Sequence, residues 1–545
     1  MKSKLLFLSL IIAFTVNSQS LTWSWARRTT SGLNTNQGQS ITTTTASNIY
    51  VAGPYNSGIT FGTYTLSGTG IYVAKYDSLG NLLFAFKAAG SILINSVKIT
   101  SDNSGNVILA GSYNNNLTVG ATTLSATGLQ SFIAKYDGSG NPLWVKALNG
   151  SNVGYVYDVT TDAGNNPIVT GSFTGTLATI ATTTLSNTNF SALNNAYTAK
   201  FDPNGNVLWV KKPNGVSDGR TLKTDVGGNV YVAGNFSDSL FFGTTKLLKL
   251  GSGNDIFIVK YDQNGNFVWA FREGGKSADE VYGSDLDAAN NFYITGMFVD
   301  VATGFAVGTS TVTGPNDIYL AKFDSNGNGL WITNAGGTNY DYGRDVAIDA
   351  SGNPFVVCYF ESPSITAGSY TLTNTAGGGP GGFNDIAVIK FNSSGTILAA
   401  TNPVGAKTDY GYGICADTKN NVYITGSAQS NTLAFGTQSL TLPGFDNFYV
   451  ARLKGGNTLG VETIQMKNVK VDIYPNPNNG EFKISLDNSV KEVAVSIISV
   501  TGVIVWEHKN IDSLIDVKLN LPKGLYFVNV KDNEGNFETK KILIQ

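Results

Sequence analysis

Residues 132–144 read FIAKYDGSGNPLW, and closely similar stretches stand at 72–84 (YVAKYDSLGNLLF), 197–209 (YTAKFDPNGNVLW), 257–269 (FIVKYDQNGNFVW) and 319–331 (YLAKFDSNGNGLW). Weaker copies begin at Ala387 and Phe448. The seven copies carry their basic residue at intervals of 60 to 68 residues, at Lys75, Lys135, Lys200, Lys260, Lys322, Lys390 and Arg452. A sustained period of this length indicates one supersecondary unit that is repeated seven times.

Each repeat contains a second hairpin pattern between these copies, for example VKITSDNSGNVILAGSY at 97–113 and LKTDVGGNVYVAGNF at 222–236. Two hairpins give four antiparallel strands per repeat, and four-stranded units in a long array are typical of a β-propeller. The segment LTWSWARR at 21–28 has the pattern of only the last strand of a repeat, which the seventh repeat lacks. We therefore predict an all-β fold, a seven-bladed β-propeller whose N-terminal strand closes the last blade, followed by a small C-terminal β-sandwich.

The repeat resembles a known family. The Gly-Asn-x-Tyr hairpins, the Phe-Gly pairs at 61–62, 242–243 and 435–436 and the Lys-Tyr-Asp phrase are similar to the SBBP-type β-propeller repeat of bacterial exported proteins. The resemblance extends over about Leu21 to Lys454 and implies a fold and an exported location, without an activity.

The two ends of the chain predict further processing. Lys2 and Lys4 precede an apolar run from Leu5 to Phe14, which predicts a signal peptide over residues 1–18 and a mature chain that begins near Gln19. The expected organisation is a propeller over 19–454 with about 62 residues per blade, a linker over 455–470 and a C-terminal domain over 471–545. We expect no transmembrane segment, because no later stretch has about 20 consecutive apolar residues.

The C-terminal stretch begins VDIYPNPNNGEFKISL at Val471 and resembles the type A C-terminal sorting domain of the type IX secretion system. The residues that carry the resemblance are Tyr474, Pro475, Asn476, Pro477, Gly480, Phe482, Gly502, Gly524, Tyr526, Lys540 and Lys541. The resemblance implies passage across the outer membrane with the secretion machinery as partner, and a secreted or cell-surface protein that is either attached or released. An accessory β-sandwich with another role is the alternative.

Composition limits the chemistry that we expect. The net charge is −2 without a basic run after the N-terminus, so nucleic acid is not an expected partner. The single histidine, His508, lies in the C-terminal stretch, so the propeller has no Ser-His-Asp or Cys-His site and no His-ligated zinc. Cys358 and Cys415 either bridge neighbouring blades or remain as two buried thiols.

Asp-x-Asn-Gly-Asn turns, such as Asp262, Asn264 and Asn266, offer oxygen ligands to calcium. The same residues are expected in a plain structural turn, and the turns lack a closing bidentate acid. We therefore expect no cofactor, with calcium as the alternative at these turns.

A candidate ligand site lies where one blade connects to the next. These connections contain VSDGR, SADEVYG, TNYDYGRD and KTDYGYG, and they place acids, tyrosines and arginines together near the mouth of the central channel. The candidate ligand-binding residues are Arg220, Asp279, Tyr282, Asp341, Tyr342, Arg344, Asp409 and Tyr410. Tyrosine rings with hydrogen-bonding acids and arginines suit a glycan or a protein loop. Alternatively, the repeated Asp and Tyr-Gly residues cap the inner strands and pack between blades.

Three functions are compatible with this sequence. The leading hypothesis is an exported binding or adhesion protein that is displayed by its sorting domain. The second is a carbohydrate-active enzyme with a paired-carboxylate site, formed by Asp279 or Glu280 with Asp341. The third is a structural surface component without a ligand. We expect no catalysis, and hence no catalytic residues, from the leading hypothesis.

Overall fold

The computed structural model describes residues 21–29, 36–90, 96–150, 154–175, 177–180, 183–186, 194–442, 445–454, 471–486, 493–499, 504–510, 514–532 and 537–545. These residues form strands and turns without a helix, so the predicted all-β class is confirmed. They belong to two compact units that divide between Gly456 and Asn457. The predicted signal peptide, 1–18, and the predicted linker, 455–470, lie outside the described residues.

The first unit contains seven four-stranded antiparallel sets, which we call blades 1 to 7 in chain order. Blade 1 consists of β2 (Ser40–Thr43), β3 (Ile49–Tyr55), β6 (Gly70–Tyr76) and β7 (Leu82–Gly90). Blade 2 consists of β8 (Val97–Ser101), β9 (Val107–Val119), β10 (Thr122–Tyr136) and β11 (Pro142–Gly150). Blade 3 consists of β12 (Gly154–Thr161), β13 (Pro167–Phe173), β16 (Asn195–Phe201) and β17 (Val207–Lys211). Blades 4 and 5 are β18 (Ser217–Thr224), β19 (Val230–Phe236), β22 (Asp255–Tyr261) and β23 (Phe267–Glu273); and β24 (Asp279–Leu286), β25 (Phe292–Val307), β26 (Ser310–Phe323) and β27 (Gly329–Ala335). Blades 6 and 7 are β28 (Asp341–Ile348), β29 (Pro354–Phe360), β32 (Asp385–Phe391) and β33 (Ile397–Thr401); and β34 (Asp409–Ala416), β35 (Val422–Ala428), β38 (Asn447–Lys454) and β1 (Thr22–Arg28).

Short hairpins follow the second strand of five blades. They are β4 (Ile59–Phe61) with β5 (Tyr64–Leu66), β14 (Leu177–Ile180) with β15 (Thr183–Ser186), β20 (Ser239–Phe242) with β21 (Thr245–Leu248), β30 (Ser364–Ala367) with β31 (Tyr370–Thr373), and β36 (Thr432–Phe435) with β37 (Gln438–Thr441). The Phe-Gly pairs of the repeat form the turns of three of these hairpins, where Gly62, Gly243 and Gly436 have positive φ angles of 54°, 60° and 57°. In blades 2 and 5 the long strands β9, β10, β25 and β26 extend into an equivalent hairpin, and pairing of β7 with β9 joins blades 1 and 2 into one sheet.

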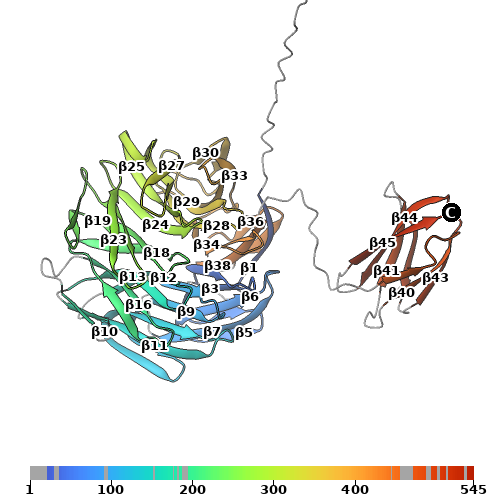
Figure 1. Cartoon of the computed structure of the whole chain (residues 1–545), viewed down its shortest axis with the longest axis horizontal. Helices are drawn as coiled ribbons and strands as arrows, with labels where there is room; N and C mark the ends of the chain where they lie inside the picture. The colour runs from blue at the N-terminus through green and yellow to red at the C-terminus, as the bar shows by residue number, and fades with distance from the viewer. Residues whose placement is uncertain are drawn as a thin grey trace, which may run out of the picture. The chain divides into compact units, whose positions relative to one another are not determined.

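The blades surround a centre, and the chain ends close the ring. The inner strands β2, β8, β12, β18, β24, β28 and β34 contact one another in that order, and β34 contacts β2 again; several of them surround the middle of this unit in Figure 1. The Thr43 hydroxyl of β2 donates a hydrogen bond to the Ala416 carbonyl of β34 at 2.9 Å. At the outer edge of blade 7, β1 pairs antiparallel with β38, with Trp23 opposite Leu453 and Arg28 opposite Tyr449. Residues more than 400 positions apart in the sequence therefore share one blade.

Repeated lysine and tryptophan residues fasten neighbouring blades together. In blade 3, Lys200 Nζ and Trp209 Nε1 both donate to the Gln263 carbonyl in the outer turn of blade 4, at 3.0 and 3.2 Å. Lys200 also pairs with Asp162 of its own blade at 2.7 Å. At the ring closure, Arg452 and Trp25 of blade 7 donate in the same way to the Ser78 carbonyl of blade 1. The motif that defines the repeat is thus the contact between repeats.

The aspartate side chain of each Asp-x-x-Gly-Asn turn accepts hydrogen bonds from within the turn. The Oδ1 atom of Asp262 accepts hydrogen bonds from the amides of Asn264 and Asn266, and its Oδ2 atom accepts one from the Asn266 side chain. Gly265 has a φ angle of 79° and lies against the Trp209 ring, where a Cβ atom would be 2.8 Å from the indole. These contacts account for the motif as a structural turn of the Asx type.

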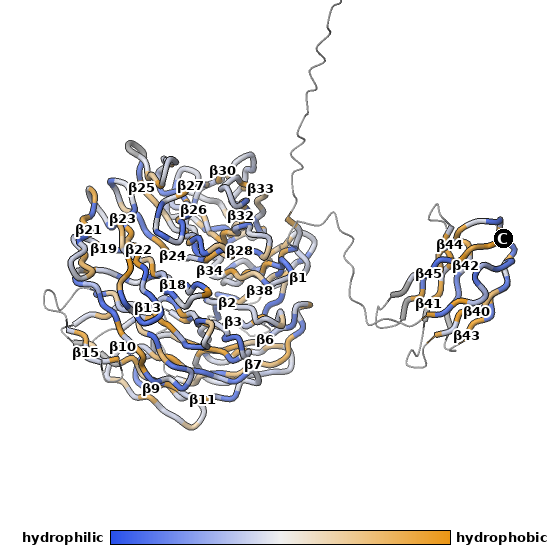
Figure 2. Tube along the Cα trace, viewed as in Figure 1, coloured by the Kyte–Doolittle hydropathy of each residue, from blue (hydrophilic) through white to orange (hydrophobic). Residues whose placement is uncertain are grey.

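The propeller has no single central core. Its buried apolar residues form seven clusters among the described residues, and each cluster lies between two neighbouring blades. Figure 2 shows apolar segments throughout this unit. Cys358 is buried in one such cluster, and its thiol contacts the Ala387 carbonyl. Both cysteines are free, so the unbridged alternative describes them.

The second unit contains two antiparallel sheets around one apolar cluster. The three-stranded sheet is β39 (Val471–Tyr474), β40 (Glu481–Leu486) and β43 (Leu514–Lys518). The four-stranded sheet is β42 (Ile504–Asn510), β41 (Val493–Ser499), β44 (Gly524–Asp532) and β45 (Phe537–Ile544). Alternate residues of each strand, such as Phe482, Ile484 and Leu486, enter the shared cluster, as expected when two sheets pack face to face.

Candidate functional site: the mouth of the central channel

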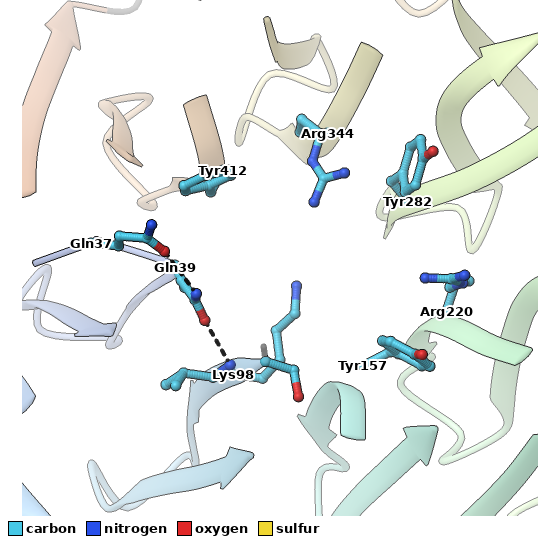
Figure 3. Close-up of a pocket in the computed structure, with 10 residues that line it drawn as sticks. Gln37, Gln39, Lys98, Tyr157, Arg220, Tyr282, Arg344 and Tyr412 are labelled. Atoms are coloured by element: carbon cyan, nitrogen blue, oxygen red, sulfur yellow. Dashed lines mark hydrogen bonds between the residues drawn. The ribbon is translucent and has the colours of Figure 1, made fainter. Parts of the chain in front are cut away.

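The inner strands enclose a cavity of about 380 Å³ at the end of the channel where the blade connections lie. Its volume is at the lower end of the range for small-molecule sites. The lining residues are Gln37, Gln39, Ser96, Val97, Lys98, Tyr157, Arg220, Tyr282, Arg344 and Tyr412. Figure 3 draws these residues as sticks around an open space and labels eight of them. Every blade contributes at least one side chain to this cavity.

Strand bulges place five of these side chains in the cavity. In blades 3 to 7 the pairing of the inner strand with its neighbour shifts by one residue, for example between Val156 and Asp158 and between Gly343 and Asp345. The unpaired residues are Tyr157, Arg220, Tyr282, Arg344 and Tyr412. A bulge re-aims a side chain that would otherwise follow the strict alternation of a strand. Tyrosine and arginine thus alternate around five consecutive blades.

Cation–π contacts hold the arginines against the tyrosines. The Arg220 guanidinium lies 4.5 Å from the centre of the Tyr157 ring, and that of Arg344 lies 4.6 Å from the centre of the Tyr282 ring. Arg344 also lies within 6.0 Å of the Tyr412 ring. Such contacts stabilise a charged group by about 0.5–2 kcal/mol and fix its orientation. The cavity wall is therefore a pre-arranged set of cations and aromatic faces.

A second cavity of about 170 Å³ shares Lys98 and Tyr282 with the first and continues into the channel. Lys223 lies here with Asp158, Asp285 and Asp345. Burial alone lowers the pKa of Lys223, but the charges of the three carboxylates outweigh it and raise that pKa overall. Each of these carboxylates also accepts a hydrogen bond from a backbone amide of the next inner strand. The pairs are Asp158 with Leu222, Asp285 with Ile348 and Asp345 with Ile414.

Three of the eight predicted site residues, Arg220, Tyr282 and Arg344, line the larger cavity. Tyr342 and Tyr410 lie beside it in a chain of aromatic contacts that runs through Tyr359 to Tyr412, with ring centres 5.0 to 5.5 Å apart. Burial raises the pKa of Tyr342 to about 12. These two residues support the wall that the bulge residues form.

The predicted acids Asp279, Asp341 and Asp409 are fully buried and line neither cavity. Asp341 accepts hydrogen bonds from the amides of Gly337 and Ser362 and from the Ser362 hydroxyl, and Asp409 has equivalent partners at Gln429 and Ser430. Burial raises the pKa of all three carboxyl groups to about 7. Their contacts are those of the capping role that was the alternative for these residues.

Sequence reasoning did not select Gln37, Gln39, Lys98 and Tyr157, and it placed Tyr412 near the mouth without choosing it for the site. The signal for Tyr157 and Tyr412 was present, because each occupies the position of Arg220 in its own repeat. Blade 2 has no shift in its pairing, and Lys98 pairs directly with Ala110. Residue spacing therefore could not transfer the site to blade 2.

In the second unit, the Tyr-Pro-Asn-Pro segment binds the last strand. The Asn476 side chain donates to the Lys541 carbonyl at 2.7 Å and accepts from the Leu543 amide at 2.9 Å. Phe482 and Tyr526 are buried in the shared cluster, and Gly480, with a φ angle of 99°, lies where a Cβ atom would meet the Leu519 carbonyl. The motif residues Pro475, Pro477, Gly524, Lys540 and Lys541 belong to the same segments, whereas Gly502 lies outside the described residues.

Two family models match the chain. Residues 472–545 match the secretion system C-terminal sorting domain, and residues 404–433 match the β-propeller repeat of the SBBP type. Among the described residues, none forms a helix of the length and hydropathy needed to cross a membrane.

Curated relatives are similar at low identity. A WD repeat-containing protein of Acanthamoeba polyphaga mimivirus is 24% identical over 515 residues, with 75% of this chain and 36% of the relative covered. The regulatory protein FlaEY of Caulobacter vibrioides is 23% identical over 273 residues, with 47% and 28% covered. An ulvan lyase of Nonlabens ulvanivorans is 35% identical over 89 residues, 16% of each chain. The chain thus covers about a third or less of the length of these relatives.

Solved structures are similar to this chain at about 10% identity. The Pan2 WD40 domain of Neurospora crassa superposes with a TM-score of 0.41 and covers 81% of this chain and 97% of its own. PorZ, a surface component of the type IX secretion system of Porphyromonas gingivalis, has a TM-score of 0.27 and covers 93% and 81%. The sequence resemblances are confirmed by the two family models: the chain carries an SBBP-type β-propeller repeat and a type IX secretion sorting domain, and it is a secreted or cell-surface protein.

Proposed function

We propose that this protein is a binding or adhesion protein of the cell exterior, and that a glycan or a loop of a partner protein enters the mouth of its channel. The observation that carries the proposal is the convergence of side chains from all seven blades on one cavity, five of them from strand bulges. A bulge interrupts strand pairing, so its presence at the same place in five blades favours a role for the side chain that it presents.

Binding has more support than catalysis in this cavity. Paired-carboxylate hydrolysis needs two acids that face the substrate. Asp279 and Asp341 line neither cavity, and Glu280 accepts a hydrogen bond from the Tyr282 hydroxyl. The wall of this cavity instead offers aromatic faces and cations, and its lining residues include no carboxylate, which favours holding a ligand over paired-carboxylate hydrolysis.

A glycan array probed with the full-length protein tests this proposal, with the Tyr412→Ala variant beside the wild type. We expect saturable binding to a subset of glycans and its loss in Tyr412→Ala, because that ring forms part of the cavity wall. Tyr64→Ala is the matched control, since Tyr64 is an exposed tyrosine on the outer hairpin of blade 1. Binding that survives Tyr412→Ala would contradict the proposed location.

A partner protein is tested by cross-linking on intact cells that display the protein. We expect cross-linked partners to be lost in Tyr412→Ala and retained in Tyr64→Ala. A blank array together with an unchanged cross-linking pattern in Tyr412→Ala would favour the third hypothesis, a structural surface component.

A further inference from the structure

The charges in the cavity are all of one sign. Lys98, Arg220 and Arg344 line it, and the remaining lining residues are glutamine, serine, valine and tyrosine, whereas the acids Asp158, Asp285 and Asp345 lie with Lys223 in the smaller cavity that Lys98 also lines. The whole protein has a net charge of −2, so this local excess of positive charge does not follow from its composition. A concave site with one sign of charge concentrates ligands of the opposite sign.

Lys98 and Arg344 have hydrogen-bond donors without a carboxylate partner. Among the described residues, no carboxylate lies within ion-pair distance of Lys98 or Arg344, and Arg220 has only Asp218 at 3.4 Å. The Nε–H groups of Arg220 and Arg344 are buried and have no hydrogen-bond partner in the described part of the chain. A buried donor without an acceptor costs about 1–3 kcal/mol, and native proteins contain few of them. A ligand in the open space does not reach these buried atoms, but the Nη groups of Arg344 and the Lys98 ammonium group also have no acceptor among the described residues, and an anionic ligand would supply one.

The tyrosines and glutamines that line the cavity suit a sugar ring. Lys98 and Arg344 reach toward the open space from opposite sides, with the tyrosines 157, 282 and 412 around it (Figure 3). Aromatic faces provide flat apolar contact surface for a pyranose ring. Gln37 and Gln39 form an amide pair through Gln39 Nε2 and Gln37 Oε1 at 3.0 Å, which leaves the Gln37 amino group to bind a hydroxyl.

We propose that the channel mouth binds an anionic saccharide, whose carboxylate or sulfate group lies between Lys98, Arg220 and Arg344 and whose ring lies against the tyrosines. This inference rests on the proposed binding function and names the class of its ligand. A carboxylate and a sulfate present the same planar pairs of acceptor oxygens to a guanidinium, so both belong to the class.

Isothermal titration calorimetry with the full-length protein tests the charge directly. The probes are trigalacturonate and its fully methyl-esterified form, which differ in charge, and galactose 6-sulfate beside galactose, which tests sulfate. We expect binding to trigalacturonate or to galactose 6-sulfate, weaker binding to the neutral partner of the pair, and affinity that falls as salt is added. Which charged probe binds decides between a sugar acid and a sulfated sugar.

Charge-removing variants locate the site. Arg344→Gln and Lys98→Gln each remove a cation from the cavity, and each is expected to weaken binding of the charged probe about ten- to hundredfold, as for one charge-assisted hydrogen bond. Lys419→Gln is the matched control, because Lys419 is exposed in the inner-hairpin turn at the opposite end of β34. If Arg344→Gln fails to fold, Lys98→Gln alone still tests the site.

The outcomes separate the two proposals. Equal affinity for a charged probe and its neutral partner, lost in Tyr412→Ala, would overturn the anionic class and leave the binding site standing. Binding of the charged probe that is unchanged in Arg344→Gln and Lys98→Gln would overturn the location. Absence of binding to every probe would overturn the anionic-saccharide proposal, and the array and cross-linking experiments would then decide the binding function on their own.

Discussion

Truncation of Trp25 to alanine tests how the N-terminal strand closes the ring. Trp25 lies on β1, 6% exposed, and its Nε1 atom donates to the Ser78 carbonyl of blade 1 at 3.1 Å. Its ring packs on Gly80, where a Cβ atom would lie 2.7 Å from the indole. The side chain thus joins the last blade to the first, across the one place where the ring has no covalent connection.

The expected loss of stability follows from this burial. An aromatic side chain buries about 150–250 Å², and at about 25 cal/mol per Å² this corresponds to roughly 4–6 kcal/mol as an upper value. Measured tryptophan truncations in cores cost about 3–5 kcal/mol, which we take as the expected effect of Trp25→Ala. Trp25→Phe keeps most of the apolar contact and loses the hydrogen bond, so about 1 kcal/mol is expected.

Urea unfolding of the full-length protein, followed by intrinsic fluorescence, measures this loss, because six of its seven tryptophans lie in the propeller. The control is Leu143→Ala on the outer strand of blade 2, where the side chain is 53% exposed and a change within about 0.5 kcal/mol is expected. If Trp25→Ala were no more destabilising than Leu143→Ala, ring closure through β1 would contribute nothing to stability and our reasoning would be refuted.

Three further predictions concern the buried charges and the sorting domain. Burial raises the folded-state pKa of Asp409 from 3.8 to about 7, so the folded state binds the proton more tightly than the unfolded state does. The free energy of unfolding therefore falls as the pH rises from about 4 to 7. Urea midpoints measured from pH 4 to 8 should fall less steeply in Asp409→Asn than in the wild type, and an identical slope would contradict the assignment. Lys200→Met leaves its buried partner Asp162 unpaired, so a loss of about 3–5 kcal/mol in the free energy of unfolding is expected in the same assay. The double variant Lys200→Met with Asp162→Asn should recover part of this loss, and no recovery would show that the pair is not coupled. Asn476→Ala removes both hydrogen bonds to the last strand, so less protein should reach the surface in cell fractionation than with the control Asn479→Ala, and equal amounts would show that this contact is dispensable.

The fold was predictable because the residues that form the contacts between blades belong to the repeated motif. Lys200 and Trp209 stand nine positions apart in the sequence, and both donate to one carbonyl of the next blade. Any chain that repeats this pair with its Asp-x-x-Gly-Asn turn must place the repeats side by side. The complementary ends could be recognised for the same reason, since Trp25 and Arg452 are two halves of one such unit.

The candidate site was only partly predictable because it depends on a shift in strand pairing. Tyr342 and Arg344 are two residues apart on β28, so a regular strand would place both on the same face. The bulge between Gly343 and Asp345 instead presents Arg344 to the cavity, while Tyr342 packs on Tyr359. A bulge leaves no fixed composition in the sequence. The acids were selected for their chemistry, although their regular positions at the start of each inner strand are those of caps.

The position that fastens the blades and the bulge position differ in how much they vary between repeats. The position that fastens the blades is basic in all seven repeats, and in five of them a hydrogen bond joins it to a backbone carbonyl of the neighbouring blade, from Lys75, Lys200, Lys260, Lys322 and Arg452. The bulge position differs between blades: it holds tyrosine in blades 3, 5 and 7 and arginine in blades 4 and 6, and these side chains contact one another around the cavity. Substitution there changes the wall of the cavity and leaves the lysine and tryptophan contacts to the next blade in place. Under the proposed binding function, exchange of a few inner-strand residues would change which ligand the cavity holds, and the alternation of Tyr and Arg is the feature from which we infer the ligand class.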